Sequence, residues 1–287
     1  MAFAFAVSGL AAVGAALGLK RAWSWYVTES ATIRFFEACR EEDYDRAARL
    51  MASADVKKPS VQAAIGRMFE VGNGVDRDYA EAVKWYRMAA EKGNARALNN
   101  LGTMYYSGRG VEKDHAVAVE LFKRASEGGN ILAPRNIGSA YYYGTGVESN
   151  LVEAAKWFRV AAERGEPEAQ YDLGLMYLHG RGVEKDLSEA MEWFRLSAQH
   201  GHGEAIGRIG WMYLKGEGVK EDKEEAFRWI LAAAERDIVW AQAYVGCMHQ
   251  KGVGTETNET KAVYWYQMAA RNGNAYAKKA LKRMERK

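Results

Sequence analysis

The feature that most constrains this chain is the segment from Leu101 to Val111, which recurs along the sequence at a fixed interval of 36 residues. The first glycine of each copy marks the register, with no insertion or deletion between copies: Gly66, Gly102, Gly138, Gly174, Gly210 and Gly246. A constant period of this length indicates a stacked repeat array, in which each unit packs mainly on its neighbours. The 287 residues are therefore expected to form a repeat array rather than ordinary globular domains.

Each repeat is predicted to fold as two helices, and the second copy shows the pattern. Its first helix, helix A, is expected from about residue 95 to 107, because core residues recur there at helical spacing: Ala97, Leu101, Met104 and Tyr105. Gly108 and Gly110 then break the helix. The second helix, helix B, is expected to start after Asp114 and to end near Glu127, with Gly129 as its left-handed cap. Its buried face is expected to consist of Ala118, Leu121, Phe122 and Ala125.

The signals that start and end helix B recur in the other copies. The predicted N-cap is always Asp or Asn, whose side chain can accept hydrogen bonds from the free backbone amides of the first turn. These residues are Asp78, Asp114, Asn150, Asp186, Asp222 and Asn258. A glutamate three residues later predicts capping boxes in four copies: Glu81, Glu153, Glu189 and Glu225. Helix B also carries a tryptophan column: Trp85, Trp157, Trp193, Trp229 and Trp265. Asp237 replaces the closing glycine in the fifth copy, which predicts an altered turn before the last repeat.

The repeats define the expected domain organisation. Residues 31–58 look like a degenerate copy without the glycine loop and are predicted to form a capping helix pair. Six repeats cover residues 59–274, and residues 275–287 are predicted to form a C-terminal capping helix. Terminal units of a solenoid depart from the repeat pattern because they must meet water. The predicted fold class is all-α, a solenoid of six helix pairs with capping helices.

The repeat resembles the Sel-one-like repeat family, a relative of the tetratricopeptide repeats. The resemblance rests on the pattern A-x-x-x-L-G-x-M-Y-x-x-G-x-G-V-x-x-D followed by A-x-x-W-[YF]-x-x-A-A-x-x-G, and it covers nearly everything from Pro59 to Lys287. It implies a right-handed α/α superhelix that serves as a scaffold for protein–protein contacts, often in bacterial envelope or signalling contexts. Some members carry a cysteine pair in each repeat. This chain has only Cys39 and Cys247, near opposite ends of the array, so no disulfide is expected.

Residues 1–30 are expected to form a membrane anchor or a signal segment. Residues 2–19 carry no charged side chain, and as a helix they would span about 27 Å, close to the hydrocarbon thickness of a bilayer. Lys20 and Arg21 follow, and then an aromatic cluster typical of a membrane interface. The favoured interpretation is a single-pass N-terminal hydrophobic helix with the repeats on the cytoplasmic side. A cleaved signal peptide, with the repeats periplasmic or secreted, and a buried or peripheral helix are the alternatives.

Composition and motifs give no indication of catalysis, metal binding or nucleic-acid binding. The formal net charge of +3 does not suggest nucleic-acid binding. The G-x-G pairs follow no strand and lack the lysine-serine/threonine ending of a phosphate loop, so they are interpreted as turns. His179, His200 and His202 suggest a metal site, but a helix of about 13 residues separates the first from the others by roughly 20 Å. Because no nucleophile setting is present either, we expect no enzyme activity, no cofactor and no metal.

A candidate binding groove follows from the A helices, which line the concave face in superhelices of this kind. The stripe of residues 96, 99, 103 and 106 lies on one side of the helix, next to the core face. Carrying this stripe along by the 36-residue period gives a set in the later copies that is more apolar and aromatic than in the first two: Arg135, Tyr142, Tyr171, Leu175, Leu178, Trp211, Leu214 and Trp240. Trp211 and Trp240 lie outside the tryptophan column of helix B. They either pack against neighbouring helices or form an exposed patch that marks a partner site.

The predicted function is a membrane-anchored interaction scaffold, or adaptor, that binds a peptide or a helix of another protein in this groove. One alternative is an envelope hydrolase of the β-lactamase type, because some relatives with this repeat have been described as hydrolases of β-lactams, although no residues here support it. The other is a self-assembling structural element, in which the groove or the anchor joins copies of the chain into a homo-oligomer. The sequence names neither the partner nor the pathway.

Overall fold

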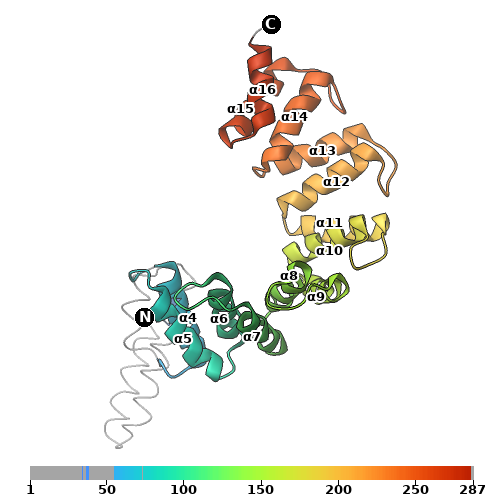
Figure 1. Ribbon diagram of the computed structural model, residues 1–287. Helices are drawn as coiled ribbons and strands as arrows, with labels where there is room; N and C mark the ends of the chain where they lie inside the picture. The colour runs from blue at the N-terminus through green and yellow to red at the C-terminus, as the bar shows by residue number, and fades with distance from the viewer. Residues whose placement is uncertain (1–33, 35–36, 39–54, 73, 286–287) are drawn as a thin grey trace, which may run out of the picture. The chain divides into compact units, whose positions relative to one another are not determined.

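A computed structural model describes residues 34, 37–38, 55–72 and 74–285 (Figure 1). The predicted anchor in residues 1–30 and most of the predicted capping pair in residues 31–58 lie outside this part. Helix is the only regular secondary structure in the described residues. None of these helices is both long and apolar enough to cross a membrane. The chain divides into two compact units, Met1–Ala133 and Pro134–Lys287.

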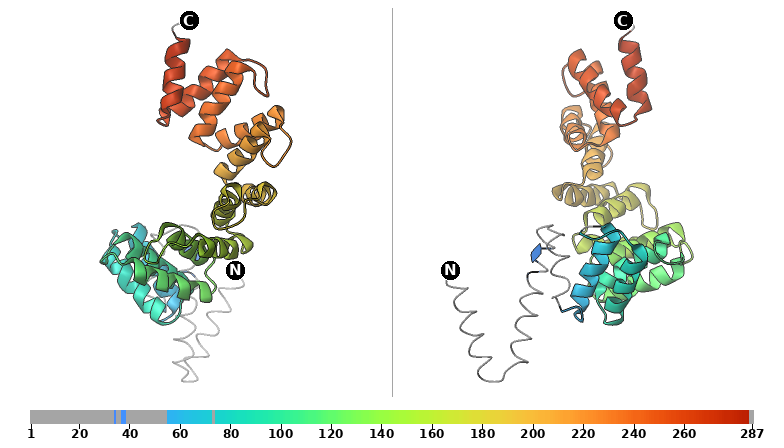
Figure 2. Two further views of the ribbon diagram at one scale, coloured as in Figure 1. Left: turned by 45° about the vertical axis from the view of Figure 1, so that its right-hand side comes forward. Right: turned by 90° about the vertical axis from the view of Figure 1, so that its left-hand side faces the viewer.

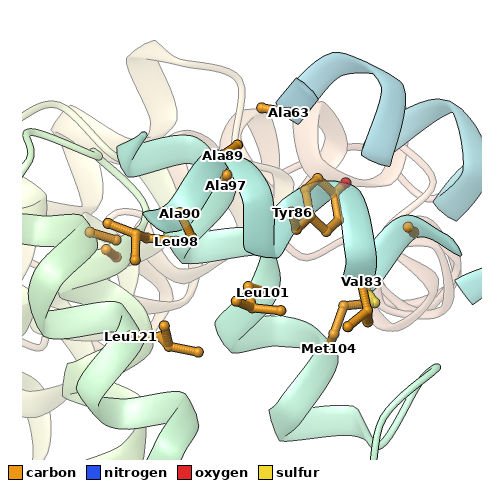
Figure 3. Packing of buried hydrophobic residues seen from close by; sticks show 13 residues of the cluster. Ala63, Val83, Tyr86, Ala89, Ala90, Ala97, Leu98, Leu101, Met104 and Leu121 are labelled. Atoms are coloured by element: carbon orange, nitrogen blue, oxygen red, sulfur yellow. The ribbon is translucent and has the colours of Figure 1, made fainter. Parts of the chain in front are cut away.

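Unit 1 contains two complete helix pairs among its described residues: α4 (Pro59–Val71), α5 (Tyr79–Glu91), α6 (Ala95–Ser107) and α7 (His115–Glu127). Each helix packs on the next one along the chain. The bounds of α6 and α7 confirm the two helices predicted for the second repeat. Side chains from all four helices pack in one core (Figure 3). Ala63 comes from α4, Tyr86 from α5, Leu101 from α6 and Leu121 from α7.

Unit 2 continues the same alternation: α8 (Ala133–Tyr143), α9 (Leu151–Glu163), α10 (Pro167–His179), α11 (Leu187–Gln199), α12 (Gly203–Lys215), α13 (Lys223–Ala234), α14 (Val239–Lys251), α15 (Glu259–Arg271) and α16 (Ala275–Met284). From α9 to α16 each helix packs on its neighbours in the sequence (Figure 2). The predicted all-α repeat solenoid is therefore confirmed. Even-numbered helices are the A helices and odd-numbered helices are the B helices, and α16 is a lone A helix at the C-terminal end.

The starts of the B helices follow the prediction in one respect and not in another. All six predicted Asp and Asn N-caps accept hydrogen bonds from first-turn amides. The predicted capping boxes are wrong, because the N-cap amide already donates to a carbonyl of the preceding A helix. Asp78 N donates to Phe69 O at 2.9 Å, and the equivalent bond recurs in the other five repeats. Glu81 is therefore left to form an ion pair with Lys84 at 2.7 Å.

The repeated glycine of helix A makes room for a large side chain of helix B. This side chain follows the tryptophan column by one residue and is buried in every repeat: Tyr86, Phe122, Phe158, Phe194, Ile230 and Tyr266. A Cβ added at Gly174 would lie 2.7 Å from Cε1 of Phe194. The glycine therefore lets the two helices of a repeat approach closely, and the tryptophans beside it are only half-buried.

In four of the A–B loops that the structure describes, the glycine in the middle of the loop lies against the preceding repeat: Gly110, Gly182, Gly218 and Gly254. A Cβ added at Gly110 would lie 2.2 Å from the carbonyl oxygen of Tyr79, the first residue of α5. The equivalent distance at Gly182 is 2.1 Å, to the carbonyl oxygen of Leu151. The loop backbone therefore packs directly on the backbone at the start of the previous B helix, and no other residue fits there.

The altered turn predicted at Asp237 is not observed. Asp237 has a φ of 61° and is the one non-glycine residue with a positive φ in the part of the chain that the structure describes. Ile238 N donates to Ala233 O at 3.2 Å, as Asn94 N donates to Ala89 O at 3.0 Å in the first repeat. The turn keeps its form because an aspartate tolerates the left-handed region better than most side chains.

Candidate functional site

The A helices of unit 2 carry two adjoining pockets. The first, here called the arginine pocket, has a volume of about 260 Å³ and lies over α8, α10 and α12. Its lining combines cationic, acidic and aromatic side chains: Arg135, Ser139, Tyr142, Tyr143, Phe158, Asp172, Leu175, Met176, His179, Arg181 and Arg208. Pockets with apolar walls and a few convergent polar groups are the usual form of a binding site.

The second pocket, here called the tryptophan pocket, has a volume of about 240 Å³. Its lining comes from α10, α12, the loops that follow them and the first residue of α11: Leu178, His179, Lys185, Leu187, Arg208, Trp211, Met212 and Glu217. His179 and Arg208 line both pockets, so the two form one continuous surface feature. The Lys215 ammonium lies 5.2 Å from the ring centroid of Trp211, a cation–π distance.

A partly buried polar cluster contributes Arg135 and Asp172 to the lining of the arginine pocket. Arg135 Nε lies 2.9 Å from Asp172 Oδ2 and 3.9 Å from Glu166 Oε2. Burial raises the pKa of the Asp172 carboxyl, and Arg135 offsets only part of that rise. Asp172 and Arg135 thus neutralise each other within the pocket.

Glu166 is the N-cap of α10 and is almost fully buried. Burial, together with a hydrogen bond to Glu168, raises the pKa of Glu166 to about 7. The same hydrogen bond lowers the pKa of Glu168. Because a buried carboxylate is costly, Glu166 keeps its proton to a higher pH than an exposed glutamate does.

The rim of the arginine pocket is positively charged. Arg181 lies in the loop after α10 and hydrogen-bonds the hydroxyl of Tyr142. Arg208 projects from α12, and its Nε is buried without a hydrogen-bond partner. The pKa of His179 is lowered by burial and by the neighbouring cations Arg181, Arg208 and Lys185.

The structure brings five of the eight predicted groove residues into these pockets. Arg135, Tyr142 and Leu175 line the arginine pocket, and Leu178 and Trp211 line the tryptophan pocket. Leu178 and its counterpart Leu214 are each only 8% exposed, because both pack into the helix core.

Of the three predicted groove residues that line neither pocket, Leu214 is buried, and Tyr171 and Trp240 make packing contacts. Tyr171 packs at 5.7 Å against Phe194 and at 4.8 Å against His202, measured between ring centroids. Trp240 packs over Gly207 and donates its Nε1 proton to Glu204 Oε2 at 2.8 Å. Trp240 of α14 therefore packs against the neighbouring helix α12, which is one of the two alternatives given above for this residue.

Sequence reasoning missed Arg181, His179 and Arg208 as lining residues. His179 and Arg208 lie one position away from the stripe that defined the groove, and Arg181 lies in a loop. The sequence pattern that could have identified them is a group of three basic side chains, which stand at the end of one A helix, in the loop after it and in the A helix of the next repeat. In the described residues, no group of three or more His, Cys, Asp or Glu side chains is arranged to hold a metal ion.

The family model described as Sel1 repeat matches six segments: residues 59–94, 95–130, 133–166, 167–202, 203–238 and 241–274. These segments cover most of the chain. The comparison with curated proteins gave no match.

Two solved structures share both sequence and fold with the chain. A protective antigen of uropathogenic Escherichia coli with an SLR fold is 31% identical at a TM-score of 0.75, over 90% of this chain and 56% of the antigen. This chain thus spans little more than half the length of that relative. A Sel1 repeat protein from Oxalobacter formigenes is 32% identical at a TM-score of 0.75, over 83% of this chain and 96% of that protein. Together with the six matched segments, these likenesses show that the chain belongs to the Sel1 repeat family.

Proposed function

We propose that this chain is a protein–protein interaction scaffold that binds an extended peptide, or a helix of a partner, along the A helices of unit 2. The observation that carries the proposal is the pair of adjoining pockets, which meet at His179 and Arg208. A partner segment that crosses α8, α10 and α12 would contact both. The Sel1-repeat solenoid is typical of interaction scaffolds, which supports this proposal.

The chemistry of the lining supports a protein partner. Trp, Tyr and Arg are the residue types enriched at binding hot spots, and all three line these pockets. Tyr143 at the edge of the arginine pocket is 73% exposed, and its ring packs edge-on against Tyr142 with 4.9 Å between the ring centroids, so it presents aromatic surface beside the pocket. Successive repeats present an extended surface, and such a surface suits a chain-like ligand.

Peptide selection tests the proposal even though the partner is unidentified. A displayed library of random 12-residue peptides is selected against the purified chain, and the dissociation constants of the enriched peptides are measured by fluorescence anisotropy. Trp211→Ala and Tyr143→Ala are expected to weaken binding by about 30-fold at a hot spot, since such truncations typically cost about 2 kcal/mol.

Leu196→Ala supplies the matched control. Leu196 is 39% exposed on α11 and lines neither pocket, so its truncation should leave the dissociation constant unchanged. Circular dichroism verifies that each variant keeps its helices. Selected peptides that bind equally well to wild type, Trp211→Ala and Tyr143→Ala would contradict the proposal.

We also propose that residues 2–19 tether the repeats to a membrane as a single-pass anchor. The absence of any charged side chain from this run, and the cations and aromatic residues that follow it, support the proposal. Full-length protein with a C-terminal reporter should resist carbonate extraction, and the reporter should be protected from protease in cells stripped of their outer layers. Release by carbonate would argue against the anchor, and a digested reporter would reverse the proposed cytoplasmic orientation.

A further inference from the structure

The arginine pocket contains more positive than negative charge. Of the described residues that line it, three are arginines and Asp172 is the one carboxylate. That carboxylate is already paired with Arg135 at 2.9 Å. Among the described residues, Arg181 and Arg208 take part in none of the ion pairs. The pocket therefore holds two guanidinium groups that have no acidic partner within the part of the chain that the structure describes.

Arg208 has the most to gain from a ligand. Its Nε is shielded from solvent and donates no hydrogen bond. A buried donor without an acceptor is unfavourable, and such groups in folded proteins are generally satisfied by a partner, a water or a ligand. Because Arg208 lines both pockets, an acceptor bound to it would lie where the two pockets meet.

The walls of the pocket strengthen its preference for an anion. Tyr142, Phe158, Leu175 and Met176 present apolar surface around the guanidinium groups. Such walls lower the local dielectric constant, and a charge-assisted hydrogen bond is stronger there than in water. A planar guanidinium matches a planar carboxylate through two parallel N–H donors, which gives the pair geometric specificity.

We infer that the arginine pocket binds the carboxylate of an Asp or Glu side chain in an extended acidic segment of a partner protein, with Arg181 and Arg208 as its donors. This inference rests on the proposed function and specifies the partner's chemistry. A side-chain carboxylate is favoured over a chain terminus, because the tryptophan pocket continues directly from Arg208. The residue next to the acid would then place an apolar side chain against Trp211.

The test uses peptides selected from the random 12-residue library and their matched derivatives. Each acidic binder is synthesised again with Asn or Gln in place of its acidic residue, and separately with an amidated C-terminus. Loss of one charged hydrogen bond should weaken binding to the wild-type chain by about 10-fold or more. Amidation of the terminus should change the dissociation constant by less than about 2-fold.

Variants of the chain test which arginines are responsible. In Arg181→Gln and in Arg208→Gln the difference between acid and amide peptides should fall clearly, and in the double variant to about 2-fold or less. Arg271→Gln is the matched control, because Arg271 is an exposed arginine in the last turn of α15, away from both pockets. Arg181 is exposed in a loop, so its variant remains informative even if Arg208→Gln disturbs folding.

The outcomes separate this inference from the proposed function. Peptides that bind without any preference for an acid, or a full preference that persists in Arg181→Gln and Arg208→Gln, would overturn the inference alone. Loss of binding on terminal amidation would show a C-terminal carboxylate and would also overturn it. A failure to select any binding peptide would refute the proposed function together with this inference.

Discussion

The close contact between Gly174 of α10 and Phe194 of α11 can be tested with a single methyl group. Gly174→Ala would place the new Cβ 2.7 Å from Cε1 and 2.8 Å from Cδ1 of Phe194. Carbon atoms prefer a separation of about 3.5–4.0 Å, so the ring or the helix must move by roughly 1 Å. Phe194 is fully buried, so its ring cannot relieve the contact by turning into solvent.

Two opposing effects set the size of the change. Overpacking a well-filled core costs about 1–3 kcal/mol. Alanine in place of glycine inside a helix returns about 0.5–1 kcal/mol. We therefore expect a net loss of about 1–2 kcal/mol in the local stability of the α10–α11 pair. Because repeats open locally, hydrogen–deuterium exchange of amides in these helices is the suitable measurement, and it should accelerate by about 5- to 30-fold.

A double-mutant cycle identifies the contact as the cause. Phe194→Leu removes the ring that meets the new methyl group, so Gly174→Ala should be less destabilising in its presence than in wild type. The reasoning would be refuted by exchange in Gly174→Ala that is as slow as in wild type, or by equal effects of the substitution in both backgrounds.

Two further predictions concern a buried acid and a strained turn. The pKa of Glu166 is raised to about 7, so its contribution to stability is complete below the unfolded value and is lost as pH rises through about 7. Glu166→Gln should therefore match wild type in denaturant unfolding near pH 4 and exceed it near pH 8, by up to about 3 kcal/mol; a pH-independent difference would contradict this. Asp237→Gly should stabilise the α13–α14 turn by about 0.5–1 kcal/mol in thermal unfolding. Asp237 has a φ of 61°, which glycine adopts without strain. The substitution removes the 3.2 Å hydrogen bond from Gln242 Nε2 to Asp237, but Gln242 Nε2 also donates to Ala234 O and so keeps a partner. A lowered melting temperature would contradict this prediction.

The helices could be predicted from the sequence because their signals are local. The limits of α6 and α7 follow from apolar spacing, from Asp114 as N-cap and from the glycines after each helix. The capping boxes failed because Asp78 N is engaged by Phe69 O, a contact with the preceding helix. Such a contact is not visible in the window of sequence that defines a cap.

The candidate site was predictable only in part, for a geometric reason. A strict period carries one stripe from repeat to repeat, but the environment of the stripe changes along the array. Tyr106 is 42% exposed, whereas Leu178 and Leu214 at the equivalent position are 8% exposed. Arg181 is a loop residue, and no helical stripe could include it.

The contact between each loop glycine and the previous repeat also bears on how such arrays change length during evolution. Gly182 packs on the carbonyl of Leu151, and Gly254 packs in the same way on that of Lys223. Gly110 and Gly218 also meet main-chain atoms of the repeat before them, at Tyr79 and Leu187. Duplication or deletion of a whole 36-residue unit would rejoin equivalent partners, whereas an insertion of any other length would misplace the glycine. The array is thus built to gain and lose entire repeats.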